Sequence, residues 1–203
     1  WSPGEEVLYY SAAGQTPNGD LYTITSNAQS NTNLTMTDAL SERRPRFNSA
    51  GTSLLFERID PATGLDQVWI ATALGLRVLT TGGTPGAALA GTPYIVGSDA
   101  DPVFSPDGNT VLFRRLVATG NGGLGMWDLM TVRLDTSDVP PAVFVTGPAY
   151  RGPADWGPLG IVFIETVAGS GPQMVLVDTT GGSRKVLVTA GAGFDVASPH
   201  WLH

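Results

Sequence analysis

Short runs of alternating apolar residues recur along the chain, and each run ends on an aromatic side chain. The four runs are Val7-Leu8-Tyr9, Leu54-Leu55-Phe56, Val111-Leu112-Phe113 and Ile161-Val162-Phe163. Alternation with a period of two, bounded by Gly and Pro, is typical of β-strands. A second run follows each of the first, at residues 20–24, 67–71, 130–134 and 173–177. Each unit then closes on an apolar residue followed by threonine, at residues 34–35, 79–80, 145–146 and 188–189.

A proline-and-aromatic segment precedes these runs and recurs with them. Its fullest copy lies in residues 99–116, DADPVFSPDGNTVLFRRL, and residues 45–51, PRFNSAG, match it in proline, aromatic and glycine. Shortened copies stand at Trp156-Gly157-Pro158, at Trp1-Ser2-Pro3-Gly4 and at Pro199-His200-Trp201. The aromatics lie at positions 1, 47, 104, 156 and 201, which is 45 to 57 residues apart. Four strands per unit are therefore expected, four times over.

A repeat of this length with four antiparallel strands predicts the blade of a β-propeller, an all-β fold in which blades stack around an axis. A β-sandwich is the alternative, but it gives no reason for the same motif to recur at this spacing. The expected blades are residues 1–36, 43–81, 99–147 and 152–190 of a single domain. Residues 196–203 are expected to supply the inner strand of the first blade and so close a four-bladed ring.

Trp1 and Trp201 compete for one position in that closed ring, which leaves three alternatives open. One tryptophan is displaced in a four-bladed monomer, or the chain is part of a longer propeller, or two chains exchange terminal strands as a dimer. The monomer is the favoured interpretation. Because Trp1 is no translation start, a leader or an upstream domain is expected to have been removed.

Residues 99–113 resemble the repeat of the TolB-like propellers (PD40, or WD40-like), whose pattern is Asp-x-x-Pro-x-aromatic-Ser-Pro-Asp-Gly. Residues 45–80 are similar, with Asn48-Ser49-Ala50 in place of Ser-Pro-Asp, and the remaining copies are weaker. The resemblance implies that the proline-and-aromatic segment is the innermost strand of each blade. Relatives with this repeat include the periplasmic TolB scaffold, gates on prolyl-oligopeptidase-type hydrolases and polysaccharide-lyase domains, so the fold alone does not decide the function. The chain contains no Gly-x-Ser-x-Gly motif, which argues against a gated peptidase of the prolyl-oligopeptidase type.

The amino-acid composition limits the classes of partner and the cellular location that are expected. The net charge is -7, with a single lysine, so nucleic-acid binding is not expected. The 26 glycines and 15 prolines indicate many turns and few helices. There is no cysteine, and no apolar run is long enough to span a membrane. The low lysine content and the Thr-, Asn- and Gly-rich composition favour a periplasmic or secreted protein.

The residues that flank each motif proline are the candidates for a ligand site, because propeller ligands meet the axial channel. Arg44 and Arg46 are expected to converge with Asp99 and Asp101, and Tyr150 has the position equivalent to Asp99 in the fourth unit. The arginines could grip an anion or a carboxylate. The alternative is a structural network of ion pairs, which is the favoured interpretation.

The sequence offers two further candidate sites, a calcium site and a histidine that could act as a base. Asp99, Asp101 and Asp155 are candidate ligands for Ca²⁺ in the channel, and no other cofactor is expected. His200 and His203 are the only histidines. His200 is the one candidate general base if the protein is an enzyme, but both are more readily explained as a strand residue and a chain end.

Two long irregular segments, residues 82–98 and 117–128, are candidate binding loops. Tyr94 and Trp127 could stack on a sugar or a peptide, or they could fill the core of a small propeller, which is the favoured interpretation. The expected function is an extracytoplasmic recognition scaffold for a protein, peptide or glycan. The alternative is a small lyase or hydrolase that uses His200 with an arginine clamp.

Overall fold

The computed structural model describes residues 7–13, 19–37, 40–120, 125–136, 139–147, 149–167, 169–190 and 199. These residues form four antiparallel sheets, and the described parts contain no helix. Accordingly, no helix among them has the length and hydropathy needed to cross a membrane. The predicted all-β fold is confirmed.

Each sheet is a meander in which consecutive strands pair. The first sheet consists of β1 (Val7–Ala13), β2 (Gly19–Thr25) and β3 (Asn31–Asn33). The second consists of β4 (Glu42–Phe47), β5 (Ser53–Ile59), β6 (Asp66–Thr72) and β7 (Gly75–Val78). The third consists of β8 (Asp99–Phe104), β9 (Thr110–Thr119), β10 (Gly125–Arg133) and β11 (Ala142–Val145). The fourth consists of β12 (Ala149–Gly157), β13 (Gly160–Val167), β14 (Gln173–Val177) and β15 (Arg184–Thr189).

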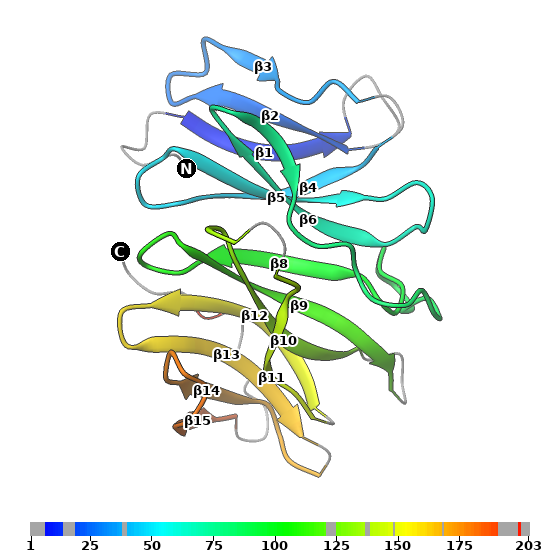
Figure 1. Ribbon diagram of the computed structural model, residues 1–203, viewed down its shortest axis with the longest axis vertical. Coiled ribbons are helices and arrows are strands. Elements are labelled where there is room, and N and C mark those ends of the chain that lie inside the picture. The colour runs from blue at the N-terminus through cyan, green and yellow to red at the C-terminus, as the bar shows by residue number, and fades with distance from the viewer. Residues whose placement is uncertain are drawn as a thin grey trace.

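The four sheets are blades of a β-propeller. They follow one another from the first at the top of Figure 1 to the fourth at the bottom. Strand β4 contacts β1 and β2 of the blade before it, β8 contacts β5 and β6, and β12 contacts β9 and β10. The edge strands β4, β8 and β12 also contact one another in sequence, as strands beside a common axis do. These three strands carry the motif prolines, so the prediction that the motif forms the innermost strand is confirmed for them.

In the first blade, β1 is equivalent to the second strand of the other blades and forms the edge of its sheet among the described residues. The strand predicted to close this blade, residues 196–203, lies outside the described residues except for Pro199. The closure of the ring, the place of Trp1, and the choice between a monomer and a strand-exchanged dimer therefore stay predictions.

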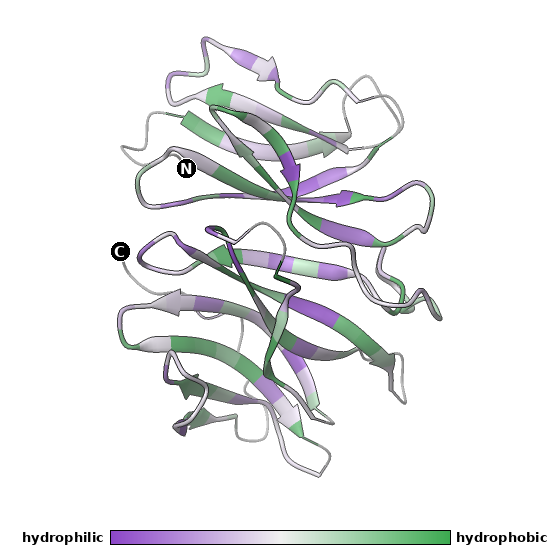
Figure 2. Cartoon of the chain, in the orientation of Figure 1, coloured by the Kyte–Doolittle hydropathy of each residue, from purple (hydrophilic) through white to green (hydrophobic). Residues whose placement is uncertain are grey.

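The core lies between successive blades. The aromatic residues that end the predicted alternating runs occupy equivalent places: Phe56, Phe113 and Phe163 are among the largest fully buried side chains. Phe56 packs in the cluster between the first and second blades, Phe113 in that between the second and third, and Phe163 in that between the third and fourth. Figure 2 shows hydrophobic segments in every sheet rather than in one of them. In β5, β9 and β13 at least four successive residues are buried, so both faces of these strands pack against neighbouring blades.

Candidate functional site

The inner strands share a β-bulge formed by the motif proline and the residue before it. Strand pairing shifts register between Arg43 and Arg46 in β4, and between Ala100 and Val103 in β8. The same shift occurs in β12 between Arg151 and Ala154, on the two sides of Pro153. A bulge leaves an extra residue outside the ladder and turns its side chain away from the sheet.

Arg44 and Asp101 are the residues that the bulges displace. Both have a left-handed backbone, with φ of 56° for Arg44 and 51° for Asp101. A residue other than glycine in this conformation costs about 1–3 kcal/mol. The same position in the fourth blade is Gly152. The surrounding structure therefore holds two charged residues in an unfavourable conformation at the place where they face the axis.

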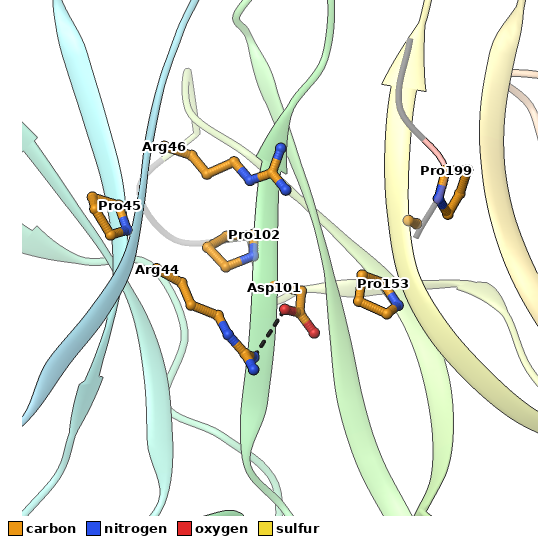
Figure 3. Close-up of a pocket in the computed structure, with 8 residues that line it drawn as sticks. Arg44, Pro45, Arg46, Asp101, Pro102, Pro153 and Pro199 are labelled. Atoms are coloured by element: carbon orange, nitrogen blue, oxygen red, sulfur yellow. Dashed lines mark ion pairs between the residues drawn. The ribbon is translucent and has the colours of Figure 1, made fainter. Parts of the chain in front are cut away.

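The inner strands enclose a cavity of about 360 Å³. Figure 3 shows Arg44 and Arg46 of β4 extending toward β8, with Asp101 opposite Arg44. The lining consists of the motif prolines and their immediate neighbours: Arg44, Pro45, Arg46, Asp101, Pro102, Pro153, Ala154 and Pro199. The cavity thus draws on equivalent positions of successive repeats. We refer to it as the axial cavity.

The Arg44 side chain is bound by neighbouring residues and is also partly exposed to the axial cavity. Its Nη1 lies 2.8 Å from Asp101 Oδ1 and 3.3 Å from Glu57 Oε1, and it also donates to the hydroxyl of Tyr94. The side chain nevertheless remains 44% exposed. Arg44 therefore presents an oriented cation to the axial cavity.

Glu57 of β5 is the buried anion behind Arg44. Its carboxylate accepts the backbone N–H of Asp101 at 2.7 Å, the Tyr94 hydroxyl at 3.0 Å and Arg43 Nε at 3.1 Å. The side chain is fully buried. Burial raises the pKa of Glu57, and the adjacent Arg44 opposes that shift.

Asp66 of β6 extends the same buried network. Arg43 donates through Nη2 to Asp66 Oδ1, whereas Oδ2 is buried and has no hydrogen-bond partner among the described residues. Burial raises the pKa of Asp66 to about 7, although Arg43 acts in the opposite direction. A proton on this carboxyl group is the physical response to an oxygen that has lost water and gained no donor.

The network continues into the next two blades through Asp101. Arg114 of β9 donates to Asp101 Oδ2 through Nε, at 2.8 Å, and through Nη2. Its Nη1 donates to the backbone oxygen of Arg151 at 2.6 Å, and its guanidinium lies 4.2 Å from the centre of the Trp127 ring. Asp101 therefore bridges two guanidinium groups, and the ion-pair interpretation of the sequence holds for this residue.

Arg46 is different from its neighbours. It lines the axial cavity and is only half-buried, and its side chain forms no hydrogen bond or ion pair with any residue that the structure describes. Arg43, Arg44 and Arg114 all bind carboxylates. Within the described part of the chain, Arg46 is therefore the cation of the axial cavity that has no carboxylate partner.

The structure gathers only part of the predicted ligand set. Arg44, Arg46 and Asp101 come together as expected. Asp99 does not reach the cavity, because it is buried and binds Arg115 with two hydrogen bonds of 2.7 and 2.8 Å. Tyr150 lies with its ring against Gly120, at the end of β9, and does not line the cavity.

The ligand-binding assignment of Tyr94 and Trp127 is wrong, because both belong to the core. Tyr94 is 4% exposed and Trp127 5%, and the two rings meet edge to face with centroids 5.3 Å apart. No ligand can stack on rings covered in this way. The alternative weighed from the sequence, that these aromatics fill the propeller core, describes them correctly.

The proposed calcium ligands do not form a common site. Asp99 and Asp101 are engaged by arginines, and Asp155 is buried with Oδ1 accepting its neighbour's N–H at 3.1 Å. Within the described ranges, no three His, Cys, Asp or Glu side chains are grouped so as to hold a metal ion. His200 and His203 lie outside the described residues, and so their catalytic and metal-binding roles stay predictions.

Sequence reasoning missed Glu57 and Arg114, which hold the charged residues of the site in place. The sequence does contain a pattern that indicates these buried charges. In β5, β9 and β13, charged residues follow the buried aromatic directly or after one residue, as in Phe56-Glu57, Phe113-Arg114 and Phe163-Ile164-Glu165. Charges in the middle of an apolar strand are buried with partners, and this could have been inferred.

Comparison with known proteins supports the fold. The sequence matches no protein-family model and no curated protein. A solved structure assigned as TolB from Agrobacterium tumefaciens superimposes with a TM-score of 0.67 at 18% identity, covering 92% of this chain and 62% of that one. TolB from Acinetobacter baumannii gives 0.65 at 16% identity, covering 93% of this chain and 42% of that one.

A chain from a nidogen/laminin complex is similar as well, with a TM-score of 0.61 at 12% identity over 92% of this chain and 62% of that one. This chain therefore spans less than two thirds of the length of these neighbours. At such identities the likeness shows the TolB-like propeller fold and nothing about the ligand.

Proposed function

We propose that this protein is a recognition scaffold that binds a carboxylate-bearing segment of a protein or peptide in the axial cavity. The observation that carries the proposal is Arg46, a cation that lines the cavity and has no partner among the described residues. A guanidinium group offers a planar set of donors that matches a carboxylate. Arg44 stands beside it, already oriented by Glu57 and Tyr94.

The rest of the lining supports a peptide or protein ligand. Four prolines and Ala154 form apolar walls next to the two arginines. A volume of about 360 Å³ is at the lower end of the range for small-ligand pockets, about 300–1,000 Å³, and suits one or two side chains. The burial of Tyr94 and Trp127 removes the aromatic platform that favoured a glycan.

The net charge of -7 does not oppose this assignment. At physiological ionic strength, charges separated by more than about 8 Å are largely screened, so the charged groups of the lining dominate the potential inside the cavity. These groups are Arg44, Arg46 and Asp101, and two of the three are cations. One structural neighbour comes from a nidogen/laminin complex, which supports protein binding by this kind of scaffold. The composition supports an extracytoplasmic location, which fractionation of cells that express the full-length protein would test.

The proposal is tested by titrating the protein, labelled with ¹⁵N-arginine, with succinate. Succinamide, the neutral analogue of similar shape, is the control. Succinate should shift the guanidinium signals of Arg44 and Arg46 in a saturable manner that weakens with added salt, and succinamide should not. Equal responses to the two compounds, or none to either, would refute a carboxylate site.

A further inference from the structure

The long connection between the second and third blades reaches Arg44, a residue that lines the axial cavity. It runs from the end of β7 at Val78 to the start of β8 at Asp99, whereas β11 and β12 are joined by only a few residues. Its middle folds into a hairpin, with an isolated bridge between Ala88 and Ile95. We refer to residues 86–96 as the hairpin loop.

The hairpin loop is fixed to the blades at its base. Gly97 N donates to the backbone oxygen of Leu116 at 2.8 Å, and Leu116 N donates to that of Ser98 at 2.9 Å. Ser98 Oγ accepts the N–H of Asp66 at 3.3 Å. The loop is therefore docked on β9 and β6, and its position relative to the inner strands is defined.

Tyr94 is the residue through which the loop contacts the charged network. Its hydroxyl donates to Glu57 Oε2 at 3.0 Å and accepts from Arg44 Nη1. The guanidinium groups of Arg43 and Arg44 lie 5.3 and 5.5 Å from the centre of its ring. Burial raises the pKa of Tyr94, so the phenol stays protonated and keeps the proton that it donates to Glu57.

We infer that Tyr94 is a positioning residue for the axial site, an inference that rests on the proposed function. Tyr94, Glu57 and Asp101 all contact Nη1 of Arg44, so Nε and Nη2 have no partner among the described residues. Arginine has many rotamers, so a ligand that binds an unrestrained Arg44 must also order that side chain. The hairpin loop removes this cost before the ligand arrives.

A purely structural role is the competing explanation, because Tyr94 also packs on Trp127. The variant Tyr94→Phe distinguishes the positioning role from the purely structural role. It keeps the ring and its contacts with Trp127 and the guanidinium groups, and it removes only the hydroxyl. Tyr9→Phe is the matched control, since the Tyr9 ring packs on Phe47 and its hydroxyl forms no hydrogen bond with the described residues.

The experiment compares the ¹⁵N guanidinium signals of Arg44 and the affinity for succinate in the wild type and in both variants. In the wild type without ligand, restricted rotation should give Arg44 distinct Nη signals. Tyr94→Phe should average those signals and weaken succinate binding about three- to tenfold, as expected for one hydrogen bond. Tyr9→Phe should change neither.

Unchanged Arg44 signals and unchanged succinate affinity in Tyr94→Phe would overturn the inference, whatever happens to the melting temperature. Thr92→Ala provides a second variant if Tyr94→Phe does not fold. Thr92 is exposed, and its hydroxyl accepts the N–H of Tyr94 at 3.2 Å, so its loss should have a smaller effect in the same direction. If the wild type does not bind succinate at all, the proposed function fails, and the Arg44 signals alone decide whether Tyr94 positions this side chain.

Discussion

Arg44 and Asp101 have the same position in two successive repeats, each one residue before its motif proline, and their side chains form an ion pair of 2.8 Å beside the axis. Both have a left-handed backbone at a β-bulge. The repeat therefore places charged residues next to one another that lie far apart in the sequence.

The buried network is expected to depend on Glu57. Replacement of Glu57 with Gln removes the fully buried anion that Arg43 and Arg44 share, and leaves them Asp66 and Asp101 as their remaining carboxylate partners. Removing one partner of a buried ion pair costs about 3–5 kcal/mol. We expect Glu57→Gln to lower the free energy of unfolding by about 3 kcal/mol in denaturant titrations.

The control for Glu57→Gln is Asp135→Asn, which breaks the exposed pair between Arg133 and Asp135. Exposed pairs contribute little because water and salt screen them. Little measurable change is expected for this variant. Similar losses in the two variants would show that burial does not determine the strength of these pairs.

The pH dependence of stability should report Asp66. Burial raises its pKa from 3.8 to about 7, so between these values the folded protein binds a proton that the unfolded chain releases. Stability from this group is therefore fully present below about pH 4 and is lost as the pH rises through about 7. The free energy of unfolding should fall over this range, and Asp66→Asn should reduce the slope.

Asp135→Asn also serves as the control in this experiment. Arg133 lowers the pKa of Asp135, so this group titrates at lower pH and should leave the slope between about pH 4 and 7 unchanged. A wild type whose stability rises over that interval would contradict the assignment of a buried, protonated Asp66.

The turn between β12 and β13 depends on Gly160. It has φ of 133°, and a Cβ atom at this position would lie only 2.3 Å from the backbone oxygen of Val177. We expect Gly160→Ala to destabilise the protein by about 3 kcal/mol or more, since both the conformation and the space exclude a side chain. Thermal and denaturant unfolding would measure this.

Gly108→Ala is the comparison for Gly160→Ala. Gly108 also has a positive φ, of 72°, but a Cβ atom there would meet nothing within 4 Å. Only the conformational cost of about 1–2 kcal/mol applies. If Gly108→Ala is as harmful as Gly160→Ala, the close approach of Val177 is not the cause.

The sequence was sufficient to predict the blades because the repeat survives substitution. In the strong copy, Ser105 Oγ accepts the N–H of Thr110 at 2.9 Å across the turn. In the weaker copy, Asn48 Oδ1 accepts the N–H of Ser53 at 3.1 Å in the same place. Ser105 and Asn48 thus form the same type of hydrogen bond across the turn. The pattern of turn and strand could therefore be recognised although the residue types differ.

The site was only partly predictable, and the reason is physical. Arg44, Arg46 and Asp101 could be placed from their distance to the motif proline, because the inner strand has a regular position. Tyr94 could not, because it reaches the network through a hairpin loop whose path depends on tertiary contacts. The role of Glu57 could not be predicted without knowing which face of its strand is buried beside the axis.

The central claim is that equivalent positions of the repeats converge on an axial site whose available cation is Arg46. It is tested most directly by the affinity for succinate of Arg46→Gln and of Arg77→Gln, an exposed arginine on the outer strand β7. Loss of a charge-assisted hydrogen bond should weaken binding about tenfold in Arg46→Gln and not at all in Arg77→Gln. Equal affinities in the two variants would contradict the account.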